Sequence, residues 1–189
     1  MGIKVCFLGY NRDETCLIQA IEAHGFDVTE ISGKMDDFSK FDVVVSFGYR
    51  HILNDRQLRT LVRPAINLHI AYLPYNRGSH PNFWSWIDGT PAGVTIHEID
   101  SGIDTGSICY QKLMTQNSTM DSFSKTYRLL IEEAECLFID NVESLLNKTY
   151  IPKPQIGDGS YHNVCDLPTW MTSWDMRIND AIRRYNETK

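Results

Sequence analysis

The sequence has 189 residues, a length typical of one domain with a short appendage. Hydrophobic residues make up 42% and charged residues 22%, which is the composition of a globular protein and excludes a disordered or fibrous chain. The formal net charge of −6 disfavours a nucleic acid as partner, because phosphate backbones bind positively charged surfaces.

The cysteines and the N-terminus indicate a cytoplasmic protein. The five cysteines are odd in number and scattered without a C-x-x-C motif, so the sequence predicts neither a disulfide framework nor a zinc site. The first apolar run is too short for a signal peptide, and no apolar run approaches the length of a membrane span. We therefore expect a cytoplasmic location, no membrane partner and no metal.

The first 70 residues predict strands that alternate with helices. Strands are expected over residues 3–8, 26–31, 42–48 and 65–70, and helices over residues 13–24 and 55–62. Such alternation is typical of an α/β protein whose mostly parallel sheet is covered by helices on both faces. In such sheets ligands bind at the carboxyl ends of the strands, so functional residues should follow the strands.

The next part of the chain predicts a short helix, two strands and one long helix. The short helix follows Pro81, and the strands are expected over residues 93–99 and 107–114. From Ser118 apolar residues recur at spacings of three and four, which predicts a single amphipathic helix that ends near Lys148. A capping box between Ser118 and Asp121 is expected at its start.

The chain divides into a domain of residues 1–150 and a C-terminal extension of residues 151–189 packed on it. The extension is rich in Pro, Gly and aromatic residues at first and ends in a charged stretch. Its residues Trp170, Met171 and Trp174 predict an apolar patch, which makes a homodimer possible.

Three polar residues form the candidate catalytic site. The strand period of two places Asn67 and His69 on one face, and Asp104 lies in a loop where Gly102 and Gly106 bring the backbone close to a ligand. A carboxylate near an imidazole raises its basicity, and an amide beside it can donate to a developing oxyanion. These residue types suit acyl transfer to an amine.

Purely structural roles are the alternative explanation for these three residues. A histidine in a strand is often a core residue, and an aspartate in a Gly-rich loop often caps its own turn. The remaining histidines lack the spacing of a ligand set: His24, His51, His80, His97 and His162.

Four segments carry a joint motif, and they span residues 67–74, 76–78, 89–97 and 100–106. Together they resemble the 10-formyltetrahydrofolate-dependent formyltransferases, and the resemblance covers roughly residues 3–148. It implies a Rossmann-like sheet and 10-formyltetrahydrofolate as the cofactor. It also implies that Asn67, His69 and Asp104 are the catalytic residues.

The resemblance implies two sets of binding residues. The cofactor is expected at the strand end after Ser46 and at the loop of Asp104, through Phe47, Gly48, Tyr49, Arg50, Ile52, Asp100, Gly102 and Ile103. The acceptor is expected to contact Tyr10, Arg12, Tyr72, Asn76, Arg77, Gly78, His80 and Trp84. Arg12 and Arg77 would meet a diphosphate, and the aromatic residues would stack on a base or sugar, although a buried helix face also requires aromatic residues.

Members of this family differ in their acceptor. The Gly-rich phosphate loop of the glycinamide ribonucleotide enzymes is missing after Gly9, and we expect no basic second domain of the kind that the tRNA enzymes carry. Residues 48–53 and 80–86 are similar to sugar N-formyltransferases, which implies a nucleotide-linked amino sugar and a role in surface polysaccharide or glycan biosynthesis. The alternatives are glycinamide ribonucleotide as acceptor, or a folate- or nucleotide-binding module without catalysis.

Overall fold

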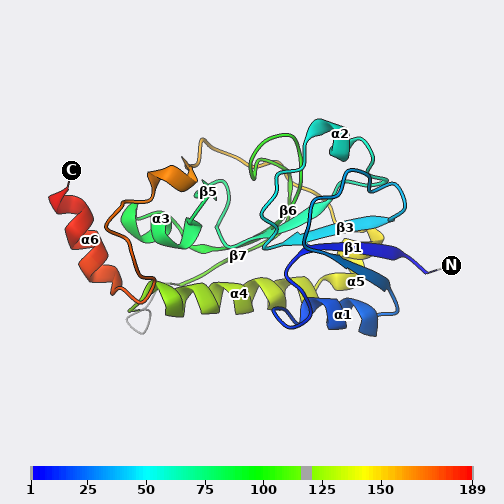
Figure 1. Cartoon of the computed structure of the whole chain (residues 1–189), viewed down its shortest axis with the longest axis horizontal. Coiled ribbons are helices and arrows are strands. Elements are labelled where there is room, and N and C mark those ends of the chain that lie inside the picture. Colours follow the sequence, from blue (N-terminus) through cyan, green and yellow to red (C-terminus); the bar gives the residue numbers. More distant parts are fainter. Residues whose placement is uncertain (1, 116–120, 189) are drawn as a thin grey trace.

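The computed structural model describes residues 2–115 and 121–188, and its centre is a six-stranded sheet (Figure 1). The strand order is β2-β1-β3-β4-β6-β7. The strands are β1 (Lys4–Gly9), β2 (Asp27–Ile31), β3 (Val43–Phe47), β4 (Ile66–His69), β6 (Gly93–Glu98) and β7 (Ile108–Leu113). The first four are parallel to one another, whereas β6 runs antiparallel to both β4 and β7, which confirms the mostly parallel α/β sheet.

The central strands are apolar on both faces. All five residues of β3 are buried, as are four consecutive residues of β1. Near-continuous apolar runs are typical of strands that are covered on both sides. The last two strands differ because β6 and β7 are joined by a loop of residues 99–107, and a connection of this length allows only an antiparallel pair.

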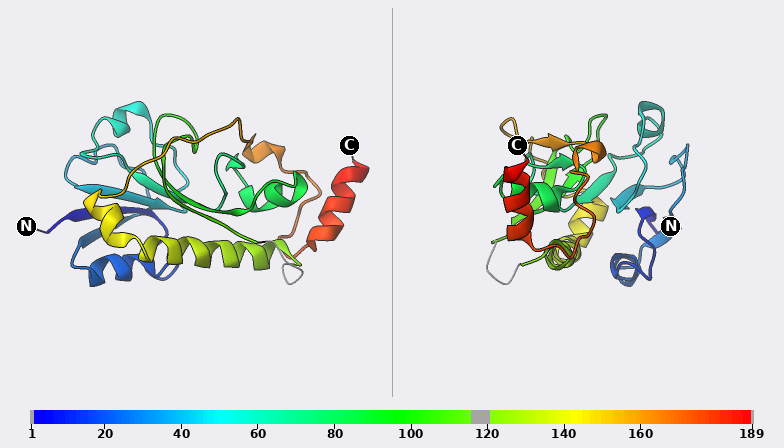
Figure 2. Two further views of the ribbon diagram at one scale, coloured as in Figure 1. Left: turned by 180° about the vertical axis from the view of Figure 1, so that it is seen from behind. Right: turned by 60° about the vertical axis from the view of Figure 1, so that its left-hand side comes forward.

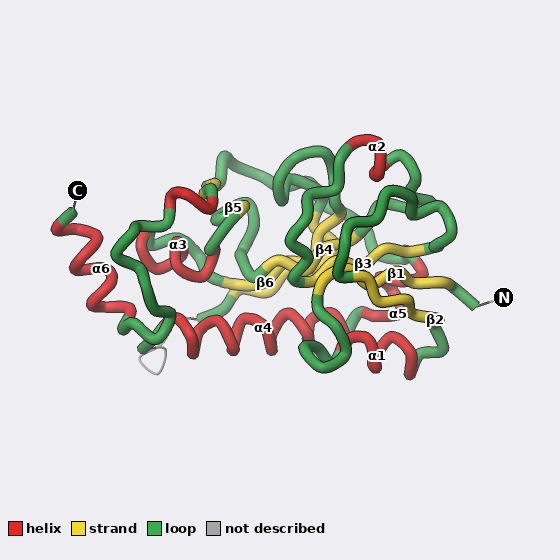
Figure 3. The backbone as a smooth tube through the Cα atoms, in the orientation of Figure 1, coloured by secondary structure: helices red, strands yellow, loops and turns green. Residues whose placement is uncertain are grey.

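Helices cover one face of the sheet and loops cover most of the other, so the predicted helical cover of both faces is only partly correct. Figure 2 shows α1 (Leu17–Ala23), α4 (Phe123–Ile139) and α5 (Val142–Asn147) on the same side, where they form the largest apolar cluster with the sheet. On the opposite face long loops pack on the strands, and they include the one-turn helix α2 (Asp55–Leu58) (Figure 3). Phe38, Phe41 and Leu53 are the buried residues that these loops contribute.

The prediction of one long helix up to Lys148 is wrong. Helix α4 ends at Ile139 and α5 begins at Val142. The side-chain amide of Asn141 donates to the Leu137 carbonyl at 2.8 Å, and such a local contact competes with continued helical hydrogen bonding. At the other end α4 begins after Ser122, and Ser118 of the expected capping box lies outside the described residues.

The two short helices of the first half are also shorter than predicted. Residues 13–16 precede α1 as a turn, in which the backbone NH groups of Glu14 and Thr15 donate to the Asn11 carbonyl. The turn satisfies these donors outside a helix, so α1 begins only at Leu17.

The extension folds back along the molecule and builds a third apolar cluster. Its elements are β8 (Tyr161–His162), a 3₁₀ turn (Val164–Asp166) and α6 (Ile178–Glu187), and β8 pairs with β5 (Arg77–Gly78). Met171 is buried in the third cluster beside α3 (Pro81–Ile87), and Trp170 packs against it. The expected apolar surface patch is therefore reduced to Trp174, which is 42% exposed, because Met171 and Trp170 pack within the chain.

Within residues 2–115 and 121–188 no helix combines enough length with enough hydrophobicity to cross a membrane.

Candidate active site

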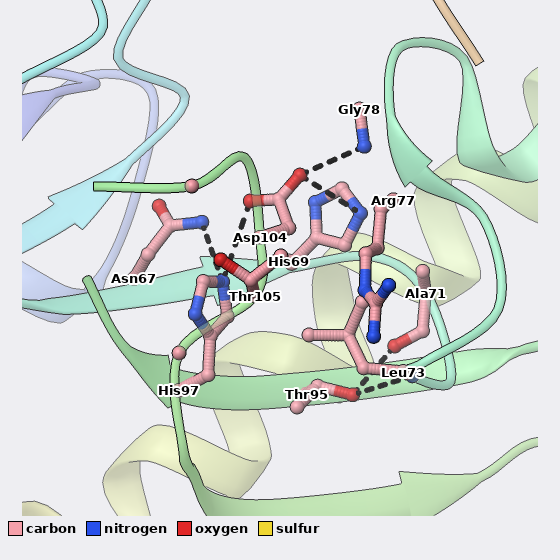
Figure 4. Close-up of polar contacts among 12 residues, drawn as sticks. Asn67, His69, Ala71, Leu73, Arg77, Gly78, Thr95, His97, Asp104 and Thr105 are labelled. Atoms are coloured by element: carbon pink, nitrogen blue, oxygen red, sulfur yellow. Dashed lines mark hydrogen bonds and ion pairs between the residues drawn. The ribbon is translucent and has the colours of Figure 1, made fainter. Parts of the chain in front are cut away.

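Asn67 and His69 lie on one face of β4, as the strand period requires, and they meet a loop from the antiparallel pair (Figure 4). Strand β4 pairs with β6, which places His97 directly opposite Asn67. The loop of residues 99–107 leaves β6 and carries Asp104 over the end of β4. The fold thus brings the three predicted catalytic residues together.

Asp104 lies at the centre of this group. One carboxylate oxygen, Oδ2, accepts a hydrogen bond of 2.9 Å from the Gly78 NH and lies 3.6 Å from His69 Nε2. The other oxygen, Oδ1, lies 3.4 Å from His97 Nε2. The Asp104 backbone adopts a left-handed φ of 54°, which residues other than glycine rarely adopt. One carboxylate therefore bridges two imidazoles.

The surroundings of Asp104 favour its ionised form. Burial by itself would raise the pKa of this carboxyl. The charge of His69, the contact with His97 and the Gly78 NH act in the opposite direction and hold the pKa well below its usual value. Asp104 is therefore a carboxylate at neutral pH and acts as an acceptor and a counter-charge.

The ring of His69 is fixed at one nitrogen. Its Nε2 lies 3.0 Å from the backbone oxygen of Asn76, and a carbonyl oxygen only accepts hydrogen bonds. Nε2 must therefore carry a proton, and in the neutral ring the lone pair resides on Nδ1. Asn76 itself is buried and held by Ser160 and Thr90, so this acceptor is rigidly placed.

His97 is a site residue that sequence reasoning missed. Its side chain is buried, its Nε2 lies 3.2 Å from Asn67 Nδ2, and its Nδ1 lies 2.8 Å from the Glu98 carbonyl. With Nδ1 donating to Glu98, Nε2 of the neutral ring accepts from the amide of Asn67, and Nε2 donates to Asp104 only when the ring is an imidazolium. The signal for this residue is its register with Asn67, which a single sequence does not reveal.

Three neighbouring cavities surround the cluster. The central one, about 260 Å³, is lined by Asn67, His69 and Asp104. A smaller cavity of about 140 Å³ shares Asn67 and Asp104 with it, and a larger one of about 600 Å³ shares Tyr127. The catalytic cluster therefore lies between two hollows, an arrangement that suits a reaction between two ligands.

All eight residues predicted for the cofactor line one of these cavities. Five lie around the smaller cavity: Tyr49, Ile52, Asp100, Gly102 and Ile103. Phe47 and Gly48 line the central cavity, whereas Arg50 lines the larger one.

Only some of the residues predicted for the acceptor do so. Tyr10 and Gly78 line the central cavity, and His80 lines the larger one beside Trp174. Four others lie outside all three cavities: Arg12, Tyr72, Asn76 and Arg77. Trp84 is buried and stacks on His162, with ring centroids 3.9 Å apart, so it is a core residue.

The two arginines expected to meet a diphosphate have other partners. The Arg12 guanidinium pairs with Glu30 at 2.6 Å and with Glu22 at 3.3 Å on the surface. The Arg77 guanidinium donates to Gln155 at 2.8 and 3.0 Å. The predicted diphosphate contacts of Arg12 and Arg77 are therefore wrong for these three cavities, because neither arginine lines any of them. Arg50 and Arg128 are the arginines that line the larger cavity.

Comparisons with known proteins point to one family. The family model described as formyl transferase matches residues 12–141. A methionyl-tRNA formyltransferase of Thermodesulfovibrio yellowstonii is 35% identical over 148 residues, covering 78% of this chain and 46% of that protein. A dTDP-4-amino-4,6-dideoxyglucose formyltransferase of Mycobacterium tuberculosis is 35% identical over 95 residues, covering 50% and 40%. The chain thus spans about half the length, or less, of these curated relatives.

One solved structure is similar over nearly its whole length. It is the formyltransferase PseJ from Anoxybacillus kamchatkensis in complex with UDP-4,6-dideoxy-4-formamido-L-AltNAc and tetrahydrofolate. The TM-score is 0.87 at 34% sequence identity, and the match covers 95% of this chain and 97% of that one.

Proposed function

Because this chain belongs to the formyl transferase family, we propose that it transfers a formyl group from 10-formyltetrahydrofolate to the free amine of a nucleotide-linked amino sugar. The observation that carries the proposal is the placement of Asn67, His69 and Asp104 between two cavities, one for each reactant. The likeness to PseJ, whose complex contains a nucleotide-linked formamido sugar and tetrahydrofolate, supports this pair of ligands.

The proposed reaction joins the acceptor amine to the formyl carbon. The amine nitrogen attacks this carbon and forms a C–N bond, and the carbonyl oxygen becomes an oxyanion. Asn67 Nδ2 and protonated His69 donate to this oxyanion, and the Asp104 carboxylate stabilises the imidazolium. The bond from the formyl carbon to N10 of the folate then breaks, and the proton lost by the amine ends on N10.

The smaller cavity fits the folate. Ile52 and Ile103 flank it with exposed apolar side chains, and exposed isoleucines beside polar backbone suit a flat, polar-edged pterin. We propose that Tyr49, Asp100 and Gly102 complete this site together with Phe47 and Gly48 from the end of β3. The bound folate supplies the activated formyl group at the side of Asn67.

The larger cavity fits the acceptor. Arg50 and Arg128 offer two guanidinium groups for a diphosphate, and Trp174, 42% exposed, offers a ring on which a base can stack. We propose that these residues and His80 hold the nucleotide, so that the sugar amine extends into the central cavity beside Tyr10 and Gly78. Arg50 is thereby reassigned from the cofactor to the acceptor.

The proposal is tested by following tetrahydrofolate release. Purified protein with 10-formyltetrahydrofolate is assayed with UDP-, dTDP- and GDP-linked amino sugars, with glycinamide ribonucleotide and without acceptor. We expect release only with an amino sugar nucleotide. Efficient formylation of glycinamide ribonucleotide would instead support the purine-synthesis alternative, and binding without any turnover would support an inactive module.

Four further features stay predictions. We propose residues 1–150 as the formyltransferase domain and residues 151–189 as its extension, and a role in surface polysaccharide or glycan biosynthesis. Five free cysteines support a cytoplasmic location. The homodimer is checked by light scattering, since two of the three residues on which it was based, Trp170 and Met171, pack internally.

A further inference from the structure

Gln155, in the C-terminal extension, contacts the backbone of the loop that carries Asp104. Its side-chain Nε2 donates to the carbonyls of Asp104 and Gly106 at 2.8 and 2.9 Å. Its Oε1 accepts two hydrogen bonds from the Arg77 guanidinium, at 3.0 and 2.8 Å. An amide has two donor hydrogens and two acceptor lone pairs, so all four positions of Gln155 are used.

The segment around Gln155 is fixed on both sides. Before it, the backbone of Lys153 exchanges two hydrogen bonds with Ile108, at 2.7 and 2.9 Å, at the start of β7. After it, strand β8 pairs with β5, the strand that contains Arg77 and Gly78. The Gln155 side chain therefore extends from a segment that is anchored to the site at two places.

Arg77 and Gly78 reach Asp104 by two routes. The Gly78 NH donates directly to the Asp104 carboxylate, while the Arg77 guanidinium acts on the Asp104 carbonyl through Gln155. The carboxylate and the backbone carbonyl of Asp104, whose φ is left-handed, are thus both held from β5, one directly and the other through Gln155. Without these contacts Asp104 has the backbone freedom to adopt the more common conformations with negative φ.

We propose that Gln155 and Arg77 are positioning residues for formyl transfer, which hold the Asp104 carboxylate against His69 and His97. The inference rests on the proposed function, because it assigns the two residues a part in that reaction. It gives the Arg77 guanidinium a role in catalysis that is independent of any phosphate. It also makes residues 151–162 part of the catalytic apparatus.

The main test is Gln155→Glu, which keeps the size of the side chain and its contact with Arg77 but removes both donors to the loop carbonyls. We expect kcat to fall about 10- to 100-fold, the scale seen for outer-shell partners in other sites, with both KM values changed less than about threefold. Gln19→Glu on the exposed side of α1 is the matched control and should behave as the wild type. A Gln155→Glu variant with wild-type kcat would overturn the proposal.

Arg77 gives an independent variant. Arg77→Ala should lower kcat in the same way, and the double variant Arg77→Ala/Gln155→Ala should be no slower than the worse single variant, because the two side chains act through one contact. A rise of the acceptor KM with unchanged kcat would mean that Arg77 contacts the acceptor, and it would overturn the positioning role.

A readout without turnover separates this inference from the proposed function. Imidazole NMR signals of His69 and His97 in the free protein should move in Gln155→Glu and stay in place in Gln19→Glu, because Asp104 faces both rings. If the signals move in Gln155→Glu but the wild-type protein formylates no acceptor, the positioning of Asp104 by Gln155 stands and the proposed function is rejected. If the signals stay in place and Gln155→Glu turns over like the wild type, only the positioning role of Gln155 is rejected.

Discussion

Asn67 and His97 are direct neighbours across β4 and β6, with 3.2 Å between Asn67 Nδ2 and His97 Nε2. The amide that is proposed to bind the oxyanion is thus oriented by a buried imidazole on the adjacent strand. The same imidazole nitrogen lies 3.4 Å from Asp104, so one ring contacts two of the three catalytic side chains. Four residues, and not three, share this polar cluster.

Removal of the oxyanion donor should abolish most turnover. Asn67→Ala is expected to lower kcat about 100- to 1000-fold, the usual effect of deleting one preorganised donor. Folate affinity, measured by fluorescence titration, should change little, since Asn67 is only one of the residues that line that cavity. Near-normal turnover in this variant would show that Asn67 has no part in oxyanion binding.

Two substitutions of His97 should differ in their effect on kcat. His97→Phe keeps a ring but leaves the Asn67 amide and the Asp104 carboxylate without this partner, so kcat should fall at least about tenfold. His97→Gln offers an amide that can serve both neighbours and should recover part of the loss. Thermal unfolding provides the check that both variants are folded, and equal activity of the two would argue against the orienting role.

Asp104→Asn should reduce kcat about 10- to 100-fold at every pH between 6 and 8, because the negative charge that faces His69 is lost while the side chain keeps its shape. Cofactor binding should change less than kcat. Wild-type turnover of Asp104→Asn across this range would remove Asp104 from the mechanism.

The lowered pKa of Asp104 also predicts a pH dependence of stability, which the same variant tests. The folded-state pKa of Asp104 is lowered, so the stability that its ionisation contributes is present above the unfolded value near 4 and is lost as the pH falls below it. The difference in the free energy of unfolding between wild type and Asp104→Asn should therefore shrink between pH 5 and pH 3. Urea titrations at these pH values measure it, and a constant difference would contradict the lowered pKa.

The arginines of the larger cavity should set acceptor affinity. A hydrogen bond to a charged group contributes about 1.5–3 kcal/mol, so Arg50→Ala and Arg128→Ala should each raise the acceptor KM about tenfold or more. Folate affinity should be unchanged. Arg12→Ala is the control, since Arg12 pairs with Glu22 and Glu30 on the surface, and an equal effect there would relocate the diphosphate.

The sequence predicted the parts of this site that depend on local rules. Strand alternation placed Asn67 and His69 on one face, the run of strands and helices predicted the sheet, and the joint motif predicted the family, all of which are confirmed. These inferences need only the period of a strand or the spacing of residues in one segment.

The parts that failed depend on contacts between distant segments. His97 joins the cluster through the register of β4 with β6, and Gln155 reaches Asp104 across 51 positions of the chain. Arg77 has the charge for a phosphate, but β5 turns its side chain to Gln155. The helix break at Asn141 is the exception, because the contact that ends the helix is local, from the Asn141 side chain to the Leu137 carbonyl, while the apolar periodicity continues through it.

One wall of the larger cavity comes from the C-terminal extension. Trp174 belongs to the extension, and its ring lies beside that of His80 in a tilted arrangement with centroids 5.4 Å apart. The Ser124 NH of α4 donates a hydrogen bond to the Trp174 carbonyl. The oxyanion donor, by contrast, is built into β4. Substitutions around Trp174 can thus reshape the acceptor pocket without disturbing Asn67, so a change of acceptor in evolution needs no change in the catalytic strand.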